Sequence, residues 1–241
     1  MLSKNTIKYL TNLQRKKFRL TSKEFVVEGE KMVLEAVQQQ KERVVKVFGI
    51  PVFLEENNLE NIDFEEITEK ELKQISTLTT PNKALVVMRQ HTAKIGEANF
   101  YLALDNIQDP GNLGSIIRLA DWYGIQDIIC SDDCVDCYNP KVVQATMGSI
   151  FRVNLHYVDL HSFLKNSKLP IYGALLNGQN VYQEQLTQSG ILLMGNEGNG
   201  IREELLPLIT NPLTIPRFGE AESLNVGFAT AILVSEFFRK S

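Results

Sequence analysis

Asn112 and Arg118 are the first residues whose types and spacing could support chemistry. They lie in the segment 104–124, LDNIQDPGNLGSIIRLADWYG, directly after an apolar run at 101–104 that predicts a buried strand. Residues 109–112 have the composition of a tight turn, and Asn112 is expected to cap the helix that follows. Backbone N–H groups at the start of such a helix, together with a guanidinium, can bind a ligand at the carboxyl end of the strand. Taken alone, the segment fits an ordinary α/β turn with a solvated arginine equally well.

Two later segments repeat this arrangement. An apolar strand at 191–194 leads into the loop 195–200, GNEGNG, before an expected helix near Arg202. A third strand, ending at 213–216, leads to Ser-Leu-Asn at 223–225 and then to a final helix. Open α/β sheets bind ligands where the carboxyl ends of their strands meet. The three loops, rich in Gly, Asn and Ser with one carboxylate, therefore predict a single site at that edge.

In order along the chain, three segments resemble the motifs of the SpoU/TrmH family of RNA 2′-O-ribose methyltransferases. They are 106–118, 194–200 and 215–229, and the resemblance covers residues 96–241. It implies a SPOUT α/β domain with a mostly parallel sheet and a deep trefoil knot at its C-terminal end. General topology would not suggest the knot, because knotted chains are very rare. The resemblance also implies S-adenosylmethionine as the cofactor and a homodimer as the working form.

The same resemblance assigns roles to individual residues. The catalytic set that it implies is Arg118, Asn112, Glu197, Ser223 and Asn225, and the cofactor contacts that it implies are Met194, Gly195, Ile215, Leu224 and Asn225. Gly227 stands where the family often has Ser, which leaves the polar residues of that motif in place. Three of these residues could instead have purely structural roles. Glu197 could be a carboxylate favoured by a helix N-terminus, and Ile215 and Leu224 could be core residues.

Methyl transfer to a ribose 2′-hydroxyl is an in-line displacement at a sulfonium methyl group. The protein must therefore bind the cofactor, orient the hydroxyl and help to remove its proton. Arg118 is a poor general base, because a guanidinium stays protonated. Its better roles are to grip the phosphate beside the target ribose and to stabilise the developing alkoxide.

The net charge of the 241-residue chain is −4, but the charge is unevenly distributed. Residues 1–31 hold eight Lys or Arg against three Glu, whereas residues 55–71 hold eight acidic residues against one Lys. This polarity predicts a surface that can meet phosphates on one side. The expected RNA contacts are Lys4, Lys8, Arg15, Lys16, Lys17, Arg19 and Lys141. A solvated helix face is the alternative interpretation.

The N-terminal part of the chain indicates a compact α/β unit. Its segment FVVEG at 25–29, after a basic amphipathic helix at 5–19, resembles the L30e-like substrate-binding domain of rRNA-directed family members. The expected strands are 25–27, 44–48, 64–67 and 84–88, and the expected helices are 30–40 and 69–75. Residues 90–98 are polar and lack periodicity, so the predicted domains are 1–95, which would bind RNA, and 96–241, which would transfer the methyl group. Ribosomal RNA is favoured over transfer RNA, by fold-level analogy.

Two other functions compete with methyl transfer. Cys130, Cys134 and Cys137 have the C-x3-C-x2-C spacing of radical S-adenosylmethionine enzymes, which bind an iron–sulfur cluster through three thiolates. The carboxylates interleaved among these cysteines would oppose such a cluster, so this hypothesis is disfavoured. The second competitor is a non-catalytic RNA-binding protein on the same scaffold, against which the complete set of polar motif residues argues.

Composition disfavours several further classes. The chain is 44% hydrophobic and 22% charged, as is typical of globular proteins. It has no apolar run near the ~20 residues of a membrane span and no signal segment, so a cytoplasmic location without a membrane partner is expected. Three cysteines are too few for a disulfide scaffold. The three histidines lack metal-ligand spacing, so no metal is expected, and no P-loop is present.

Overall fold

The computed structural model describes residues 1–239, and these fall into two compact units. Unit 1 comprises residues 1–92 and 136–151, and unit 2 comprises 93–135 and 152–241. Unit 1 therefore takes in a segment, 136–151, that the predicted division at residue 95 places in the second domain. No helix among the described residues is long and apolar enough to cross a membrane.

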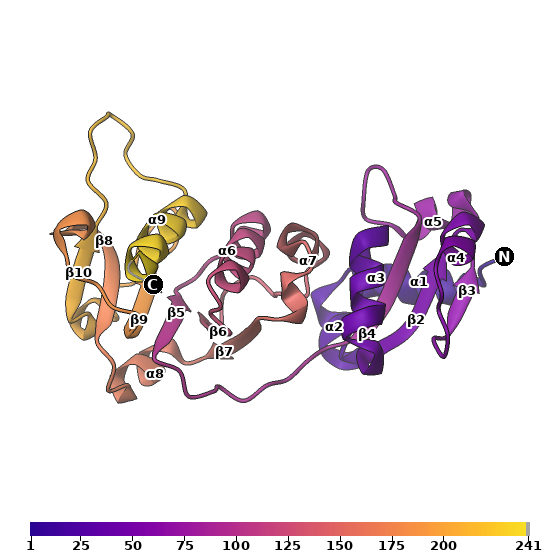
Figure 1. The fold of residues 1–241 in the computed structure, drawn as a ribbon, viewed down its shortest axis with the longest axis horizontal. Coiled ribbons are helices and arrows are strands. Elements are labelled where there is room, and N and C mark those ends of the chain that lie inside the picture. The colour runs from indigo at the N-terminus through magenta and orange to yellow at the C-terminus, as the bar shows by residue number, and fades with distance from the viewer. Residues whose placement is uncertain (240–241) are drawn as a thin grey trace. The chain divides into compact units, whose positions relative to one another are not determined.

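Unit 1 is built on a four-stranded sheet with the order β1-β4-β2-β3 (Figure 1). The pairs β1–β4 and β2–β4 are antiparallel and β2–β3 is parallel. The strands are β1 (Glu24–Glu28), β2 (Val44–Gly49), β3 (Phe64–Glu66) and β4 (Ala84–Arg89). The helices are α1 (Lys4–Leu13), α2 (Lys16–Ser22), α3 (Glu30–Gln39), α4 (Pro51–Glu56), α5 (Glu69–Ile75) and α7 (Pro140–Thr146), with short 3-10 turns at Lys41–Arg43 and Ser149–Phe151. The four expected strands and the expected helices 30–40 and 69–75 are present, and α4 is an addition to them.

The single basic helix predicted at 5–19 is wrong, because the structure has two helices there. Arg15 is in an extended conformation between α1 and α2. The break lets Arg19 turn inward, where its Nη1 donates to the carbonyl oxygen of Leu13 at 2.8 Å and its Nη2 lies 2.7 Å from Oδ2 of Asp136. The ion pair with Asp136 supplies the counter-charge that a buried guanidinium needs.

Helix α5 begins with a capping box that also holds the start of the chain. The hydroxyl of Thr68 accepts from the N–H of Glu71 at 3.2 Å, and the Glu71 carboxylate accepts from the N–H of Thr68 at 2.9 Å. The other oxygen of that carboxylate accepts from the N–H of Leu2 at 2.5 Å. These hydrogen bonds lower the pKa of Glu71 to about 2, with those to Thr68 and Leu2 contributing most.

The segment 136–151 packs into unit 1 through several contacts. The rings of Phe25 and Tyr138 lie 4.5 Å apart between centroids, and the N–H of His91 donates to the Tyr138 hydroxyl at 2.9 Å. Val142 and Val143 of α7 are buried. The apolar side of α7 is therefore part of the core of unit 1.

Unit 2 contains a six-stranded sheet with the order β10-β8-β9-β5-β6-β7. Every strand pair in it is parallel. The strands are β5 (Phe100–Leu104), β6 (Asp127–Ser131), β7 (Asn154–Val158), β8 (Ile171–Asn180), β9 (Gly190–Met194) and β10 (Asn211–Thr214). The helices are α6 (Pro110–Trp122), α8 (Leu160–Asn166) and α9 (Val226–Phe238), with 3-10 turns at Val181–Gln183 and Leu206–Leu208. The predicted α/β fold with a parallel sheet is confirmed.

Both faces of this sheet are covered by helices. Phe100 packs on Phe237 and Phe238 of α9, whereas its neighbour Tyr101 packs on Phe163 of α8. Successive residues of a strand point to opposite faces, so α8 and α9 lie on opposite sides. Strands buried on both faces are continuously apolar, as β5 and β9 are.

Two local predictions for unit 2 are wrong. Residues 195–205 do not form the helix expected near Arg202, and turns followed by the 3-10 helix Leu206–Leu208 occupy this region. Its three glycines and two asparagines favour turns over a helix. The N-cap of α6 is Asp109, not Asn112, because the Asp109 carboxylate accepts from the N–H of Asn112 at 2.8 Å. Pro110 then takes the first helical position, which suits its fixed φ angle.

Candidate functional site

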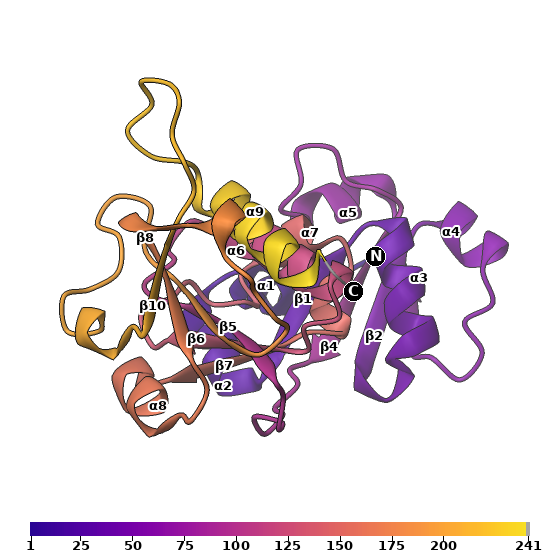
Figure 2. The same ribbon diagram turned by 60° about the vertical axis from the view of Figure 1, so that its left-hand side comes forward.

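The three motif loops all start at the carboxyl edge of the unit 2 sheet. Strands β5 and β9 are paired so that Leu104 lies opposite Met194. The N–H of Asp105 donates to the carbonyl oxygen of Met194 at 2.8 Å, which continues the pairing into the loops. The third loop, 215–225, leads from β10 to α9 and extends away from both elements (Figures 1 and 2).

A chain of side-chain hydrogen bonds joins the three loops. The Asn112 amide donates to Oε1 of Glu197 at 2.6 Å, and the Asn225 amide donates to Oδ1 of Asn112 at 2.8 Å. Asn112 is available for these contacts because Asp109 caps α6 in its place. The structure thus brings together three of the five predicted catalytic residues, from positions 85 and 113 residues apart in the sequence.

Asn225 has a second role as the N-cap of α9. Its Oδ1 accepts from the N–H groups of Gly227 at 2.9 Å and Phe228 at 3.4 Å. The amide orientation is fixed by these contacts, since the oxygen faces donors and the nitrogen faces Asn112. Residue 227 also lies close to α6, where a Cβ at Gly227 would be 3.8 Å from Cβ of Ser115. The start of α9 is therefore set relative to α6 by Asn225.

Arg118 and Ser223 do not join this chain of hydrogen bonds. Arg118 is exposed on α6, on the same side of the helix as Ser115 and Trp122, which follow the helical repeat. Within residues 1–239, no hydrogen bond or ion pair engages the Arg118 side chain. The Arg118 guanidinium is therefore open to an external anion. Ser223 is likewise exposed, in the loop 215–225.

The predicted cofactor contacts lie around the same loops with different exposures. The Met194 side chain is buried in the core, Ile215 is half-buried and Leu224 is 48% exposed. At Gly195, an added Cβ would lie 2.3 Å from the backbone of Gly200 and Ile201, so only glycine allows this close approach. Met194 could therefore contact a cofactor through its backbone rather than its side chain.

The predicted RNA contacts all belong to unit 1. Six of the seven are exposed, and these are Lys4, Lys8, Arg15, Lys16, Lys17 and Lys141. Arg19 is the exception, because its side chain is 2% exposed and paired with Asp136. A guanidinium held inside the unit cannot reach a phosphate, so Arg19 does not belong to the RNA-contact set.

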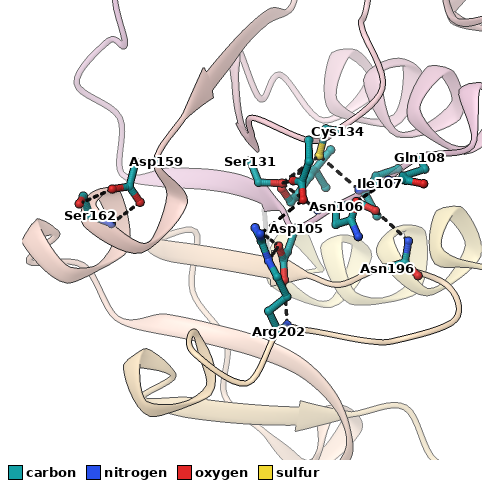
Figure 3. Close-up of polar contacts among 12 residues, drawn as sticks. Asp105, Asn106, Ile107, Gln108, Ser131, Cys134, Asp159, Ser162, Asn196 and Arg202 are labelled. Carbon is teal, nitrogen blue, oxygen red and sulfur yellow. Dashed lines mark hydrogen bonds and ion pairs between the residues drawn. The ribbon is translucent and has the colours of Figure 1, made fainter.

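Asp105, Asn196 and Arg202 form a polar cluster that the sequence analysis missed (Figure 3). Asp105 is fully buried and its carboxylate accepts from Arg202, while the Asn196 amide donates to the carbonyl oxygen of Asn106 at 2.8 Å. The sequence signal for this cluster is the position of Asp105, directly after a buried strand. Its partner Arg202 is 97 residues away and could not be assigned from spacing.

The three cysteines are buried and form no disulfide. Cys134 accepts from the N–H of Ile107 at 3.2 Å and lies within the loop that follows β6. Its pKa falls to about 7, mainly because of a hydrogen bond with Cys130, although burial opposes the change. Among residues 1–239, no group of three or more His, Cys, Asp or Glu side chains is arranged to hold a metal ion.

A shallow hollow of about 580 Å³ lies elsewhere in unit 2. It is lined by residues of α8 and by others that include Tyr101, Val158 and Asp159. None of the predicted catalytic or cofactor-binding residues lines it. The polar chain at the strand ends, rather than this hollow, is therefore the candidate site.

The fold and the polar chain together define an α/β protein with a candidate ligand site at the carboxyl edge of a parallel sheet. The model of the SpoU rRNA Methylase family matches residues 99–235, and the model of the MRM3-like substrate binding domain matches residues 4–86. The chain belongs to the SpoU rRNA methylase family, as the motifs indicated.

Individual relatives agree with this assignment. The chain is 34% identical to the 23S rRNA (guanosine(2553)-2′-O)-methyltransferase RlmP of Bacillus subtilis (strain 168), over 95% of this chain and 94% of that protein. A TrmH-family structure from Porphyromonas gingivalis superposes with a TM-score of 0.90 at 38% identity, covering 100% of both chains. The AdoMet-bound rRNA methyltransferase of Sinorhizobium meliloti gives a TM-score of 0.87 at 28% identity, covering 100% of this chain and 96% of the other.

Proposed function

We propose that this protein transfers the methyl group of S-adenosylmethionine to the ribose 2′-hydroxyl of a nucleotide in ribosomal RNA. The observation that carries the proposal is the hydrogen-bonded chain of Asn112, Glu197 and Asn225, which unites all three motifs at one edge of the sheet. RlmP is named a 2′-O-methyltransferase of 23S rRNA, and the S. meliloti structure contains AdoMet. Both relatives favour the same cofactor and substrate class for this chain.

Arg118 is proposed to contact the RNA at the reacting ribose. Its guanidinium is exposed and carries a fixed positive charge. Such a group can bind a phosphate of the substrate and lower the energy of the alkoxide that forms as the hydroxyl loses its proton. Asn112 and Asn225 are neutral, so they can orient the ribose without opposing that developing charge. Ser223 adds a hydroxyl from the same loop as Asn225.

The residues of the three loops suit S-adenosylmethionine. When bound, this cofactor supplies the electrophilic methyl group. Met194, Gly195, Ile215, Leu224 and Asn225 would hold it, through backbone groups and apolar side chains. Space beside the loop backbone supports this role, because a Cβ added at Gly200 or Gly219 would meet nothing within 4 Å. Neutral polar and apolar groups also fit an uncharged adenosine.

Unit 1 is proposed to select the RNA. Six of the predicted RNA contacts are exposed there, five of them on or beside α1 and α2 and the sixth on α7, and they can neutralise phosphates. The match of residues 4–86 to a substrate-binding domain supports the same role. Because 136–151 packs with residues 1–92, we propose that the RNA-selecting part includes α7 as well as the predicted domain 1–95.

A homodimer is proposed from the surface of α6 and α9. Helix α9 has one charged side chain in 13 residues, and a helix that is apolar on all sides is normally buried. Yet Trp122 of α6 and Phe228 of α9 are 84% and 70% exposed. A second copy of the chain would cover them. Light scattering should give the dimer mass, and a monomer at micromolar concentration would contradict this part of the proposal.

A knotted topology and a cellular location are also proposed for this chain. The deep trefoil knot would involve the loops around 195–200 and 215–225 near the C-terminal helix. A cytoplasmic location follows from the proposed ribosomal RNA substrate.

The test is transfer of a labelled methyl group from S-adenosylmethionine to RNA. A substrate with a 2′-deoxy nucleotide at the target should take up no label, which separates ribose methylation from base methylation. Comparing 2′-O-methyl sites in total RNA with and without the gene should identify the target. A protein that binds RNA but transfers no methyl group would be the non-catalytic alternative.

The Arg118→Ala variant tests the proposed role of the guanidinium. Turnover should be lost while the affinity for S-adenosylmethionine changes by no more than about threefold, because Arg118 is expected to contact RNA rather than cofactor. Lys165→Ala is the matched control, since it removes an exposed positive charge at the end of α8. Full activity of Arg118→Ala would remove this residue from the mechanism.

A further inference from the structure

Asp105 is a fully buried carboxylate at the carboxyl end of β5. Its Oδ2 accepts from the N–H of Arg202 at 2.8 Å, and its Oδ1 accepts from Nε of Arg202 at 2.6 Å (Figure 3). The second guanidinium nitrogen, Nη2, is also 2.6 Å from Oδ1. A buried charge is stable only when it is paired and hydrogen-bonded, so Asp105 depends on Arg202.

Arg202 also reaches the loop that follows β6. Its Nη1 lies 3.4 Å from Oδ2 of Asp133, whose other oxygen accepts from the Ser131 hydroxyl at 2.5 Å. The same hydroxyl accepts from the N–H of Asn106 at 2.8 Å. Arg202 is thus connected to the loops after two neighbouring strands, through carboxylates on both.

A second attachment holds the opposite end of the glycine-rich loop. The Asn196 amide donates to the carbonyl oxygen of Asn106 at 2.8 Å, and its oxygen accepts from the N–H groups of Gly198 and Asn199 at 2.9 and 3.2 Å. The backbones of Asn196 and Gly200 also exchange two hydrogen bonds. The loop is therefore fixed at residue 196 and at residue 202, to the adjacent residues 105 and 106.

Glu197 lies between these two attachments. Its carboxylate accepts from the amide of Asn112 at 2.6 Å, so any movement of the loop would move Glu197 relative to Asn112. Three of the residues from 195 to 200 are glycine, which gives the free loop many conformations. Holding both ends removes most of that freedom before substrate binds.

We propose that Arg202 is a positioning residue, which holds Glu197 in place against Asn112 through its ion pair with Asp105. This inference rests on the proposed methyl transfer. It predicts that Arg202 affects turnover without touching RNA or cofactor. A lysine cannot replace it, because a single ammonium cannot contact Asp105 through two nitrogens, as Nε and Nη2 do, and reach Asp133 with a third.

The test uses Arg202→Lys, which keeps the charge that Asp105 needs and should fold. Amide exchange at Gly198 and Asn199 should become at least about tenfold faster, and kcat should fall by a similar factor while the KM for RNA is unchanged. Glu203→Gln is the matched control, because it removes an exposed charge one residue further along. It should leave both measurements unchanged.

A double-mutant cycle separates positioning from a general loss of stability. If Arg202 acts through Glu197, the Arg202→Lys/Glu197→Gln protein should be no slower than Glu197→Gln alone. Additive losses, unchanged amide exchange, or faster exchange with normal kcat would each overturn the inference. A wild-type protein that methylates no RNA would overturn the proposed function, and the role of Arg202 with it, whereas the exchange measurement is independent of activity.

Discussion

Gly195→Ala tests whether the close backbone approach of residue 195 to Gly200 is required for stability and activity. A Cβ at this position would lie 2.3 Å from the carbonyl carbon of Gly200 and from the nitrogen of Ile201, and 2.5 Å from the oxygen of Gly200. Ordinary contacts of a Cβ begin at 3.4 Å, so the backbone would have to move by about 1 Å. Backbone atoms cannot rotate away as a side chain does.

The cost follows from what that movement breaks. Asn196 and Gly200 exchange backbone hydrogen bonds of 3.0 and 2.9 Å across the loop, and both would be lost or lengthened. At about 1 kcal/mol for each hydrogen bond, the variant should lose about 2 kcal/mol of unfolding free energy. For a chain of this size, the melting temperature should fall by about 4–8 °C. Displacing Glu197 by 1 Å should lower turnover by roughly 100-fold.

The assays are thermal unfolding, calorimetric binding of S-adenosylmethionine and methyl transfer to RNA. Gly198→Ala is a matched control three residues away, where the nearest atom to an added Cβ is Oδ1 of Asn196 at 3.6 Å. It should be nearly neutral in all three assays. If Gly195→Ala behaved like Gly198→Ala, the close approach of Gly195 to Gly200 would not be required.

Two further predictions concern unit 1. Asp136→Asn leaves Arg19 buried without a counter-charge, so the unfolding free energy measured by chemical denaturation should fall by about 3–5 kcal/mol. The double variant Arg19→Met/Asp136→Leu should recover much of the loss. An unchanged unfolding free energy in Asp136→Asn would refute this. The pKa of Glu71 is lowered to about 2, so its contribution to stability is complete above its ordinary pKa of 4.5 and is lost as the pH falls towards 2. Unfolding curves between pH 5 and 2 should show this loss in the wild type and a shallower dependence in Glu71→Gln, and parallel curves would contradict it.

The elements of the fold were largely predictable because they depend on local patterns. Continuous apolar runs gave β5 and β9, and the segment 69–75 was predicted with the same bounds as α5. One error occurred where a distant residue is bound to the local structure. The break between α1 and α2 accompanies the turn of Arg19 towards Asp136, which is 117 residues away and could not be paired with it from the sequence.

The site was predictable in its residue types but not in its contacts. The motifs indicated Asn112, Glu197 and Asn225, and the structure joins these three. They did not indicate Arg202, because a charged residue after a glycine loop is common on surfaces and its partner is far away in the sequence. Capping was assigned to the wrong residue, since both Asp109 and Asn112 are good N-cap residues and only Asp109 precedes the proline at the first helical position.

The sheet places the residues of the polar chain, and the hydrogen bonds of that chain are too weak to hold the sheet together. Its two side-chain contacts join segments 85 and 113 residues apart, and contacts of such separation carry a large loop-closure entropy. Each hydrogen bond contributes only about 1 kcal/mol, which cannot offset that entropy alone. The parallel pairing of β5 with β9 brings two of the loops together through backbone hydrogen bonds that involve no side chain of the site. The residues of the motifs can therefore be selected for chemistry, because their placement is already determined by apolar strands that take no part in it.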